Sequence, residues 1–177
     1  IHNVSILYSD PRRLLVIVSV KNTTMHIASL HAPHGNNQDT TDWWTETSCI
    51  MHKFSNGCSY IVGIDSNITP CPRDDGHTGS YVFGNESDNA GDFNKFLVDH
   101  NLWLPATFDM HAKHMKEPTF VARGCNTMND FIALPLNVEA ARDSAKVLSD
   151  FVTSLPPDHL PVVLVAVVPP SLKTSVI

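Results

Sequence analysis

The hydrophobic and polar positions along the chain predict short strands with two helices among them. Residues 14–20 are almost all leucine, isoleucine or valine, residues 21–24 have turn character, and residues 25–30 resume the strand pattern. This pattern predicts a hairpin. Residues 60–64 form a β-branched and aromatic run that is too short for a helix and is typical of a buried strand. Further strand-like runs cover residues 102–104, 119–122, 130–134 and 160–168.

Two stretches carry the apolar spacing of amphipathic helices. Residues 39–54 follow candidate capping side chains, keep apolar residues on one face and end at Asn56-Gly57. Trp43 lies on that face, where a place in the core is more frequent than a base-stacking role. Residues 90–101 also show helical spacing, with Phe93 among their apolar positions. Strands and helices that alternate in this way predict an α/β or α+β fold in layers.

Two other regions have no single prediction. Residues 68–86 form a polar loop rich in proline and glycine, and loops of this length in compact domains are usually functional or disordered. Residues 137–150 favour a helix by propensity, but Val147-Leu148 and Phe151-Val152 could also be fragments of strands. Both interpretations of that segment stay open.

Length and composition fit a single globular domain. The 177 residues are 42% hydrophobic and 17% charged, which supplies enough apolar side chains for one core. The formal charge of −6 argues against a protein that coats nucleic acid through a generally basic surface. It leaves a nuclease open, because metal ions can supply the positive charge that a carboxylate-rich site lacks.

The cysteine pattern and the lengths of the apolar runs indicate where in the cell the protein is expected. The four cysteines lie far apart without a CxxC pair, so we expect reduced thiols of an intracellular protein rather than a disulfide framework or a cysteine zinc site. No run reaches the roughly 18 apolar residues that span a membrane, and no membrane partner is expected. The chain begins with Ile1 and shows no signal-peptide pattern, so we expect a piece of a longer intracellular protein, with the nucleus as a candidate location. The sequence does not indicate an oligomeric state.

Polar side chains recur where the predicted strands end. Asp65 and Asn67 follow the strand of residues 60–64, and side chains at positions i and i+2 point the same way. Other strand ends carry His31, His34, Asn129, Asp130, Asp158 and His159. Each group alone fits an ordinary turn, and Asp65 with Asn67 fits an Asx-turn. Together they suit metal-assisted hydrolysis of a phosphodiester, because carboxylates hold Mg²⁺ and a histidine paired with a carboxylate is a general base.

Four motifs occur along the chain in a recognisable order. They are His31-Ala32-Pro33-His34, Val62-Gly63-Ile64-Asp65-Ser66-Asn67, Asn129-Asp130-Phe131-Ile132 and Asp158-His159-Leu160-Pro161-Val162-Val163. In this order they resemble the endonuclease/exonuclease/phosphatase superfamily, which includes apurinic/apyrimidinic endonucleases. The intervening motifs resemble the endonuclease domains of LINE-type retrotransposons, and they are Gly79-Ser80, Asn89-Ala90-Gly91 and Leu104-Pro105-Ala106-Thr107-Phe108.

The resemblance implies a fold and a domain boundary. The fold is α/β, a two-layer β-sandwich of mixed sheets flanked by helices, similar to that of deoxyribonuclease. Members carry an asparagine and a metal-binding glutamate before the hairpin, and nothing in this chain supplies them. We therefore expect residues 1–168 to be an N-terminally truncated domain and residues 169–177 to be a C-terminal tail.

The resemblance also implies roles for particular residues. Asp65 would contact the attacking water, and Asn67 would orient this water and the phosphate. His159 would face the scissile phosphate, paired with Asp130, and Asp158 would be a metal ligand.

The resemblance also implies two positions that would bind substrate. His31 stands where many members carry a tyrosine and His34 where many carry an asparagine, which would make phosphate binding more sensitive to pH.

One motif is a decoy. Gly91-Asp92-Phe93-Asn94 matches the family's usual signature letter for letter, but it opens a predicted helix instead of following a strand. We therefore assign the chemistry to Asp65 and Asn67.

The expected function is a metal-dependent phosphodiester hydrolase, a DNA endonuclease of retrotransposon type that acts on the DNA backbone with Mg²⁺, or alternatively Mn²⁺. One alternative is a non-catalytic remnant of such a domain, because the glutamate is missing. Another is a phosphoinositide phosphatase or a sphingomyelinase-like phosphodiesterase, because substrate choice depends on loops. Coding sequence upstream of Ile1 that supplies the asparagine and the glutamate would favour the live nuclease.

Overall fold

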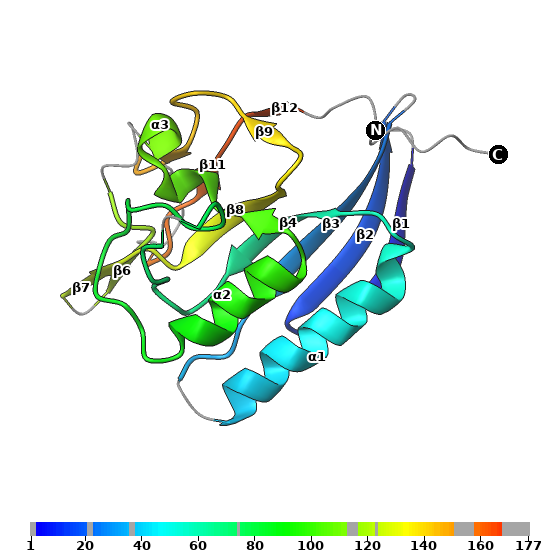
Figure 1. Ribbon diagram of the computed structural model, residues 1–177, viewed down its shortest axis with the longest axis horizontal. Helices are drawn as coiled ribbons and strands as arrows, with labels where there is room; N and C mark the ends of the chain where they lie inside the picture. Colours follow the sequence, from blue (N-terminus) through cyan, green and yellow to red (C-terminus); the bar gives the residue numbers. More distant parts are fainter. Residues whose placement is uncertain are drawn as a thin grey trace.

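A single mixed sheet organises the computed structural model, which describes residues 3–20, 23–35, 38–73, 75–112, 117–122, 124–150 and 158–167. Its six strands lie in the order β1-β2-β3-β4-β8-β5 (Figure 1). Their bounds are Asn3–Ser9 (β1), Arg13–Val20 (β2), Thr23–His31 (β3), Tyr60–Asp65 (β4), Leu102–Trp103 (β5) and Asp130–Pro135 (β8). The pair β3–β4 is parallel and the other pairs are antiparallel. The predicted hairpin is confirmed as β2–β3.

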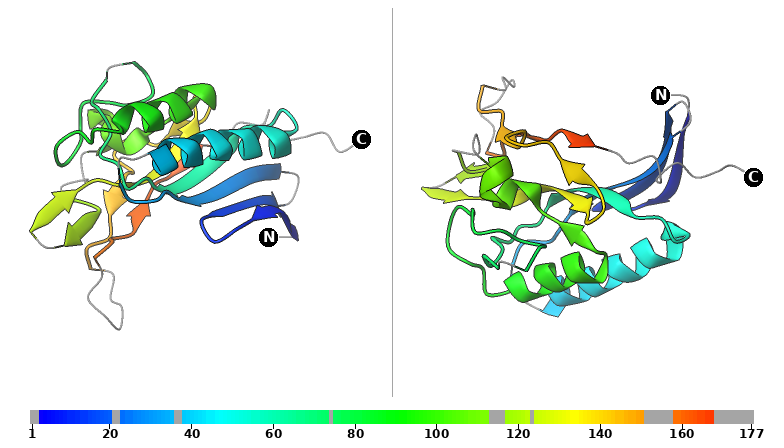
Figure 2. Two further views of the ribbon diagram at one scale, coloured as in Figure 1. Left: turned by 90° about the horizontal axis from the view of Figure 1, so that it is seen from below. Right: turned by 45° about the horizontal axis from the view of Figure 1, so that its top comes forward.

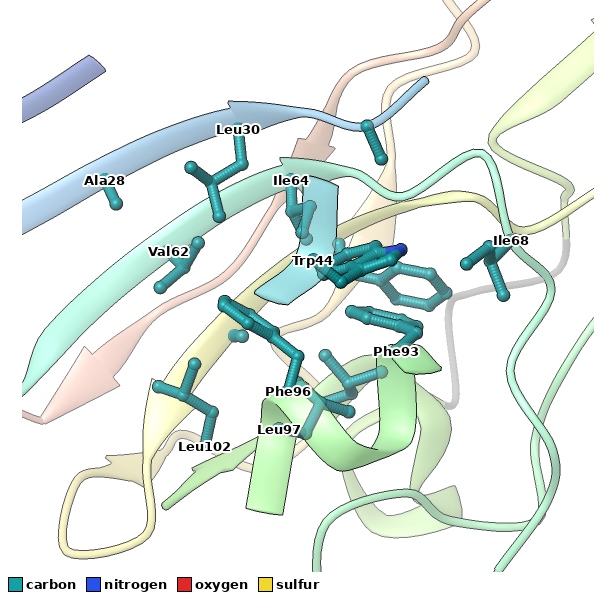
Figure 3. Packing of buried hydrophobic residues seen from close by; sticks show 14 of the residues in the cluster. Ala28, Leu30, Trp44, Val62, Ile64, Ile68, Phe93, Phe96, Leu97 and Leu102 are labelled. Carbon is teal, nitrogen blue, oxygen red and sulfur yellow. The ribbon is translucent and has the colours of Figure 1, made fainter. Parts of the chain in front are cut away.

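Two helices cover one face of this sheet, as the left panel of Figure 2 shows for α1 (Gln38–Ser55) and α2 (Ala90–Asp99). Both were predicted from their apolar spacing. Trp44 of α1 packs against Phe93 and Phe96 of α2, with ring centroids 5.1 and 5.0 Å apart. All three side chains are almost fully buried (Figure 3). Burial of one large apolar side chain contributes roughly 1.5–3 kcal/mol, so this cluster holds both helices on the sheet.

Smaller elements surround the side of the sheet at β8 and β5, and part of them covers the face opposite the helices. They are η1 (Pro105–Thr107), α3 (Asp109–Ala112), β6 (Phe120–Ala122), β7 (Cys125–Thr127), β9 (Glu139–Ala140), β10 (Lys146–Val147), β11 (Val162–Val163) and β12 (Ala166–Val167). Three two-stranded sheets result, β6–β7, β10–β11 and β9–β12. On that opposite face, Leu134, Val138 and Ala140 form a second, smaller core, against which Leu164 and Ala166 pack. The predicted layered α/β sandwich is confirmed.

The structure decides between the two interpretations of residues 137–150. It shows the strands β9 and β10 there, and no described residue between them is helical. Pairing with β12 and β11 overrides helix propensity, and Ala140 of β9 is buried in the core on that face. Phe151-Val152 lies outside the described residues.

The predicted strand of residues 160–168 is divided. β11 and β12 each contain two residues and pair with different partners, so the chain changes neighbours between them. The boundary predicted after residue 168 lies outside the described residues and stays a prediction. No helix in the described ranges is long and apolar enough to cross a bilayer, and the intracellular location stays a prediction.

Candidate active site

Strand register places three of the predicted site residues in one row. His31 at the end of β3 pairs with Asp65 at the end of β4, and Asp65 pairs with Asp130 at the start of β8. Directly paired residues point to the same face of a sheet. Their sequence neighbours Leu30 and Ile64 point to the other face and are buried under the helices. The row therefore faces away from the helices.

The C-terminal segment adds the fourth side chain. Hydrogen bonds on both sides of His159 hold its backbone, from Val121 N to Asp158 O (2.8 Å) and from Leu160 N to Thr119 O (2.7 Å). The His159 ring packs against Phe120, with centroids 4.8 Å apart. Its Nδ1 lies 3.1 Å from Oδ2 of Asp130. This contact makes the predicted pair of Asp130 and His159 a close histidine–carboxylate pair.

The carboxylate of Asp65 lies between two imidazoles. Its Oδ2 is 3.5 Å from Nε2 of His31 and 4.0 Å from Nε2 of His159. A cavity of about 520 Å³ opens onto these groups, and its lining includes Gly63 and Asp130. Asp65 and Asp130 are about one-fifth exposed, whereas His31 is 58% exposed. The two carboxylates are thus partly shielded while the histidines reach solvent.

Burial and charge set the proton affinity of Asp130. Burial raises the pKa of its carboxyl above the ordinary value, and the neighbouring charge of Asp65 raises this pKa further. The His159 ring and the Thr119 side chain lower it in part. A carboxylate with a raised pKa holds a shared proton more tightly, which strengthens its hydrogen bond to the imidazole.

Asp65 also forms the turn that follows β4. The backbone N–H of Asn67 donates to its Oδ1 at 3.1 Å, and Asn67 has a left-handed φ of 48°. The Asn67 side-chain amide donates to the Ala32 carbonyl at 2.8 Å. The Asx-turn is therefore present and uses one oxygen of Asp65, while the other oxygen faces the two imidazoles.

Three predicted residues lie outside this cluster. Asn67 and His34 line a neighbouring cavity of about 380 Å³, together with Ser87 and Asn89. Asp158 is exposed, and its Oδ1 accepts a hydrogen bond from the backbone N–H of His159 at 3.0 Å. The roles predicted for these three residues stay predictions.

Thr119 is a contributor that the sequence did not indicate. Its buried Oγ1 accepts hydrogen bonds at 3.0 Å from the backbone N–H groups of Asn129 and Asp130. It thereby fixes the start of β8, where Asp130 must face His159. A threonine in a strand-like run carries no local signal of such a role.

The decoy motif is a structural part of α2. Phe93 and Asn94 are buried, and Asp92 accepts a hydrogen bond from Oγ1 of Thr41 at 2.6 Å. These side chains join α2 to α1 and to the core, and none of them lines the cavity beside Asp65.

The donor set fits a divalent metal ion. Asp65, Asp130 and His159 each offer one ligand atom, and these three atoms lie within 4.8 Å of one another. This is the one such group among the described residues. Two carboxylates suit a hard cation such as Mg²⁺ or Mn²⁺, and the imidazole nitrogen also admits softer metals.

The fold of this chain is shared by proteins of known structure. No family model and no curated protein matches its sequence. In fold it is an α/β sandwich of the endonuclease/exonuclease/phosphatase type. It is similar to the endonuclease domain of TRAS1, a telomere-specific non-LTR retrotransposon, with 14% identity and a TM-score of 0.59 over 92% of this chain and 67% of that one.

Two bacterial structures share the fold. A mannosyl-6-phosphatase of Bacteroides thetaiotaomicron VPI-5482 has 15% identity and a TM-score of 0.58 over 88% of this chain and 56% of that one. An endonuclease/exonuclease/phosphatase family protein of Bacteroides thetaiotaomicron has 15% identity and a TM-score of 0.57 over 86% and 52%. This chain spans about half the length of both. At these identities the likeness shows the fold alone, and at that level it confirms the predicted resemblance.

Proposed function

We propose that the chain is a divalent-metal-dependent phosphodiester hydrolase and that its substrate is the DNA backbone, as in a retrotransposon endonuclease. The observation that carries this proposal is the pair of Asp130 and His159 facing Asp65 across an open cavity. The motif order and the likeness to the TRAS1 endonuclease domain favour DNA over other phosphodiesters.

The geometry supports activation of a water molecule. A carboxylate partner at Nδ1 of His159 favours the tautomer with the proton on Nδ1, which leaves the Nε2 lone pair directed toward Asp65. A water that donates two hydrogen bonds of roughly 2.8 Å spans about 4.4 Å between its acceptors. The 4.0 Å between Nε2 of His159 and Oδ2 of Asp65 therefore suits one shared water.

Hydrolysis then proceeds from this water. Its oxygen attacks phosphorus, its proton passes to His159 or Asp65, and the bond from phosphorus to the leaving oxygen breaks. The resulting imidazolium is stabilised by Asp130, because the carboxylate accepts its Nδ1 proton in a hydrogen bond. A divalent cation held by the carboxylates would neutralise the phosphate and stabilise the leaving oxygen.

Nicking of supercoiled plasmid DNA tests this function. With Mg²⁺ or Mn²⁺ we expect the wild-type chain to nick the plasmid and EDTA to stop the reaction. His159→Ala and Asp65→Asn should each lower the rate roughly 10²- to 10⁴-fold, the range of a positioned general base. Circular dichroism should show an unchanged fold in both variants.

Asp42→Asn is the matched control, because Asp42 is an exposed residue of α1 away from the cavity. It should nick as the wild type does. Full activity in either site variant would contradict the proposal, and so would release of phosphate from a monoester without nicking. Inactivity of the folded wild-type chain with both metals would favour a non-catalytic remnant.

A further inference from the structure

We propose that Arg12 binds the phosphate next to the scissile one, so that the substrate is a polynucleotide strand and not an ester with a single phosphate. This inference deepens the proposed function and rests on it for the place of the scissile phosphate. The contact itself requires no hydrolysis, and it is tested without it.

Two neighbouring arginines at the start of β2 lie on opposite sides of the sheet. Arg13 is buried on the helix side, where it forms ion pairs with Asp10 and Glu46 at 2.8 and 2.7 Å. Successive side chains along a strand point to opposite faces. Arg12 therefore lies on the side of the cavity, and it is exposed there.

Strand register places Arg12 beside the site residues. Arg13 pairs with Leu30, so Arg12 lies opposite His31, whose backbone N–H donates to the Arg12 carbonyl at 2.9 Å. Arg12, His31 and Asp65 thus form one row across three neighbouring strands. Neighbouring strands lie about 4.8 Å apart, so the backbones of Arg12 and Asp65 are roughly 10 Å apart. A nucleic-acid strand with one phosphate at Asp65 places its next phosphate within this span, because successive phosphates rise by about 3.4 Å along the axis.

The guanidinium of Arg12 is held in place and still has free donors. Its Nη1 donates to the carbonyls of His31 and Ala32, at 3.3 Å in both cases. The Ala32 carbonyl also accepts the side-chain amide of Asn67 at 2.8 Å, so the guanidinium lies beside the turn that follows β4. The two bonds use the hydrogens of Nη1 and leave those of Nε and Nη2. These two nitrogens form the fork that binds a phosphate bidentately.

The charge of Arg12 is available to a phosphate. Both oxygens of Asp10 are already occupied, Oδ1 by the backbone N–H groups of Arg12 and Arg13, and Oδ2 by the Tyr8 hydroxyl and the Arg13 guanidinium. Within the described ranges, no carboxylate forms an ion pair with the Arg12 guanidinium. Because the formal charge of the chain is −6, an uncompensated cation beside the cavity determines where a polyanion binds.

This position of the cation selects a class of substrate. An ester with a single phosphate fills the place at Asp65 and leaves Arg12 without a partner. A polynucleotide supplies an equivalent phosphate on the neighbouring nucleotide, whatever its base. The contact therefore adds affinity for the backbone of a strand and no base preference.

Fluorescence anisotropy of a labelled DNA duplex in EDTA tests this contact while hydrolysis is stopped. The association constant would be measured over a range of salt concentrations. Arg12→Gln should bind more weakly, and its logarithmic salt slope should be smaller by roughly 0.9, the value for one phosphate contact. This equals about a 3.5-fold smaller loss of affinity between roughly 50 and 200 mM salt. Arg12→Lys, which keeps the charge, should retain the wild-type slope.

Lys53→Gln is the matched control, because it removes the same charge from an exposed residue in the last turn of α1, on the helix side. It should keep the wild-type slope. An equally reduced slope in Lys53→Gln would indicate a diffuse charge effect and would overturn the inference. Weaker binding by Arg12→Gln at an unchanged slope would indicate a structural role through the carbonyls of His31 and Ala32, and it would also overturn the inference. So would a wild-type chain that does not bind the duplex.

Nicking separates this inference from the proposed function. Arg12→Gln should raise the KM of plasmid nicking more than it lowers kcat, because the neighbouring phosphate is bound both before and during the reaction. A chain that never nicks but loses the salt slope in Arg12→Gln would contradict the proposed function and leave the phosphate contact supported. A chain that nicks, with slope and KM unchanged in Arg12→Gln, would overturn only the role of Arg12.

Discussion

At the scale of single residues, the two carboxylate oxygens of Asp65 have different neighbours. Its Oδ1 accepts the hydrogen bond that closes the turn after β4, while its Oδ2 lies between the imidazoles of His31 and His159. The sequence left a turn and a site as alternatives; the structure shows the turn, and the site stays a prediction. The turn fixes the orientation of the carboxylate, because it ties one oxygen to the backbone.

Gly79, which lies outside the site, leads to a testable prediction at the scale of single residues. A Cβ added to Gly79 would touch the Thr107 carbonyl, with its carbon 2.7 Å and the Cα of Phe108 2.9 Å away. These are backbone atoms, which cannot turn aside. We expect Gly79→Ala to lower the free energy of unfolding by about 1–3 kcal/mol, the usual cost of overpacking, as measured by urea denaturation.

Gly91 offers the matched control for that experiment. It lies in the first turn of α2, and an added Cβ would meet no atom within 4 Å. Because alanine favours helices over glycine by up to about 1 kcal/mol, Gly91→Ala should leave stability unchanged or raise it. A Gly79→Ala chain as stable as the wild type would show that the close approach to Thr107 is not maintained in solution.

At the scale of elements, the interface of α1 and α2 contains a titratable pair. His100, which caps the C-terminus of α2, stacks on His52 of α1 with ring centroids 4.5 Å apart and also packs against Phe96. Burial lowers the pKa of His100 to about 4, and the positive charge of His52 adds to this effect. Lys95 lowers this pKa as well, whereas Asp99 raises it.

This lowered pKa predicts how stability depends on pH. The unfolded chain, with a histidine pKa near 6.5, takes up the proton more readily than the folded chain does. Stability from this group is therefore complete above pH 6.5 and is lost as the pH falls toward 4. Thermal unfolding should show a Tm that declines over this range, and His100→Phe should flatten the decline.

His34→Gln controls for a general histidine effect, because His34 is exposed in the loop after β3. Its Tm should follow the wild-type curve. A decline in His100→Phe as steep as in the wild type would contradict the assignment of this pH dependence to His100.

The predictability of each element from sequence follows from where its stabilising contacts lie. The helices α1 and α2 carry their own apolar periodicity, so local pattern was enough. β1 was not predicted. Its first four residues are exposed, and buried and exposed positions do not alternate along it. β9 was not predicted, and the predicted strand of residues 160–168 is divided, because these short strands depend on partners far along the chain, which local pattern does not contain.

At the scale of the whole molecule, the two faces of the large sheet differ. The helices cover one face, and β9 to β12 cover the other only near β4 and β8 (Figure 2, left). Val4 and Ile6 of β1 and Leu14 of β2 are 50%, 68% and 40% exposed. The register Val4↔Val18 and Ile6↔Val16 puts them on the face opposite α1. This exposed apolar area is the feature in which the described chain departs most from a closed sandwich.

From the sequence, residues of the candidate site could be predicted to lie together only where strand pairing fixes their positions. His31, Asp65 and Asp130 meet because strand register aligns them, and His159 joins them through the bridge to Phe120. Asn67, His34 and Asp158 were predicted for the same place. Their side chains follow turns, whose direction no short motif determines, and they lie outside the cluster.

The most direct test of the account is a double-mutant cycle on Asp130 and His159, 29 positions apart in the chain. The value of kcat/KM for plasmid nicking would be measured for the wild type, Asp130→Asn, His159→Ala and the double variant. If the two residues act as one unit, the double variant should be no slower than His159→Ala. Losses that multiply in the double variant would show that the residues act independently and would contradict the account.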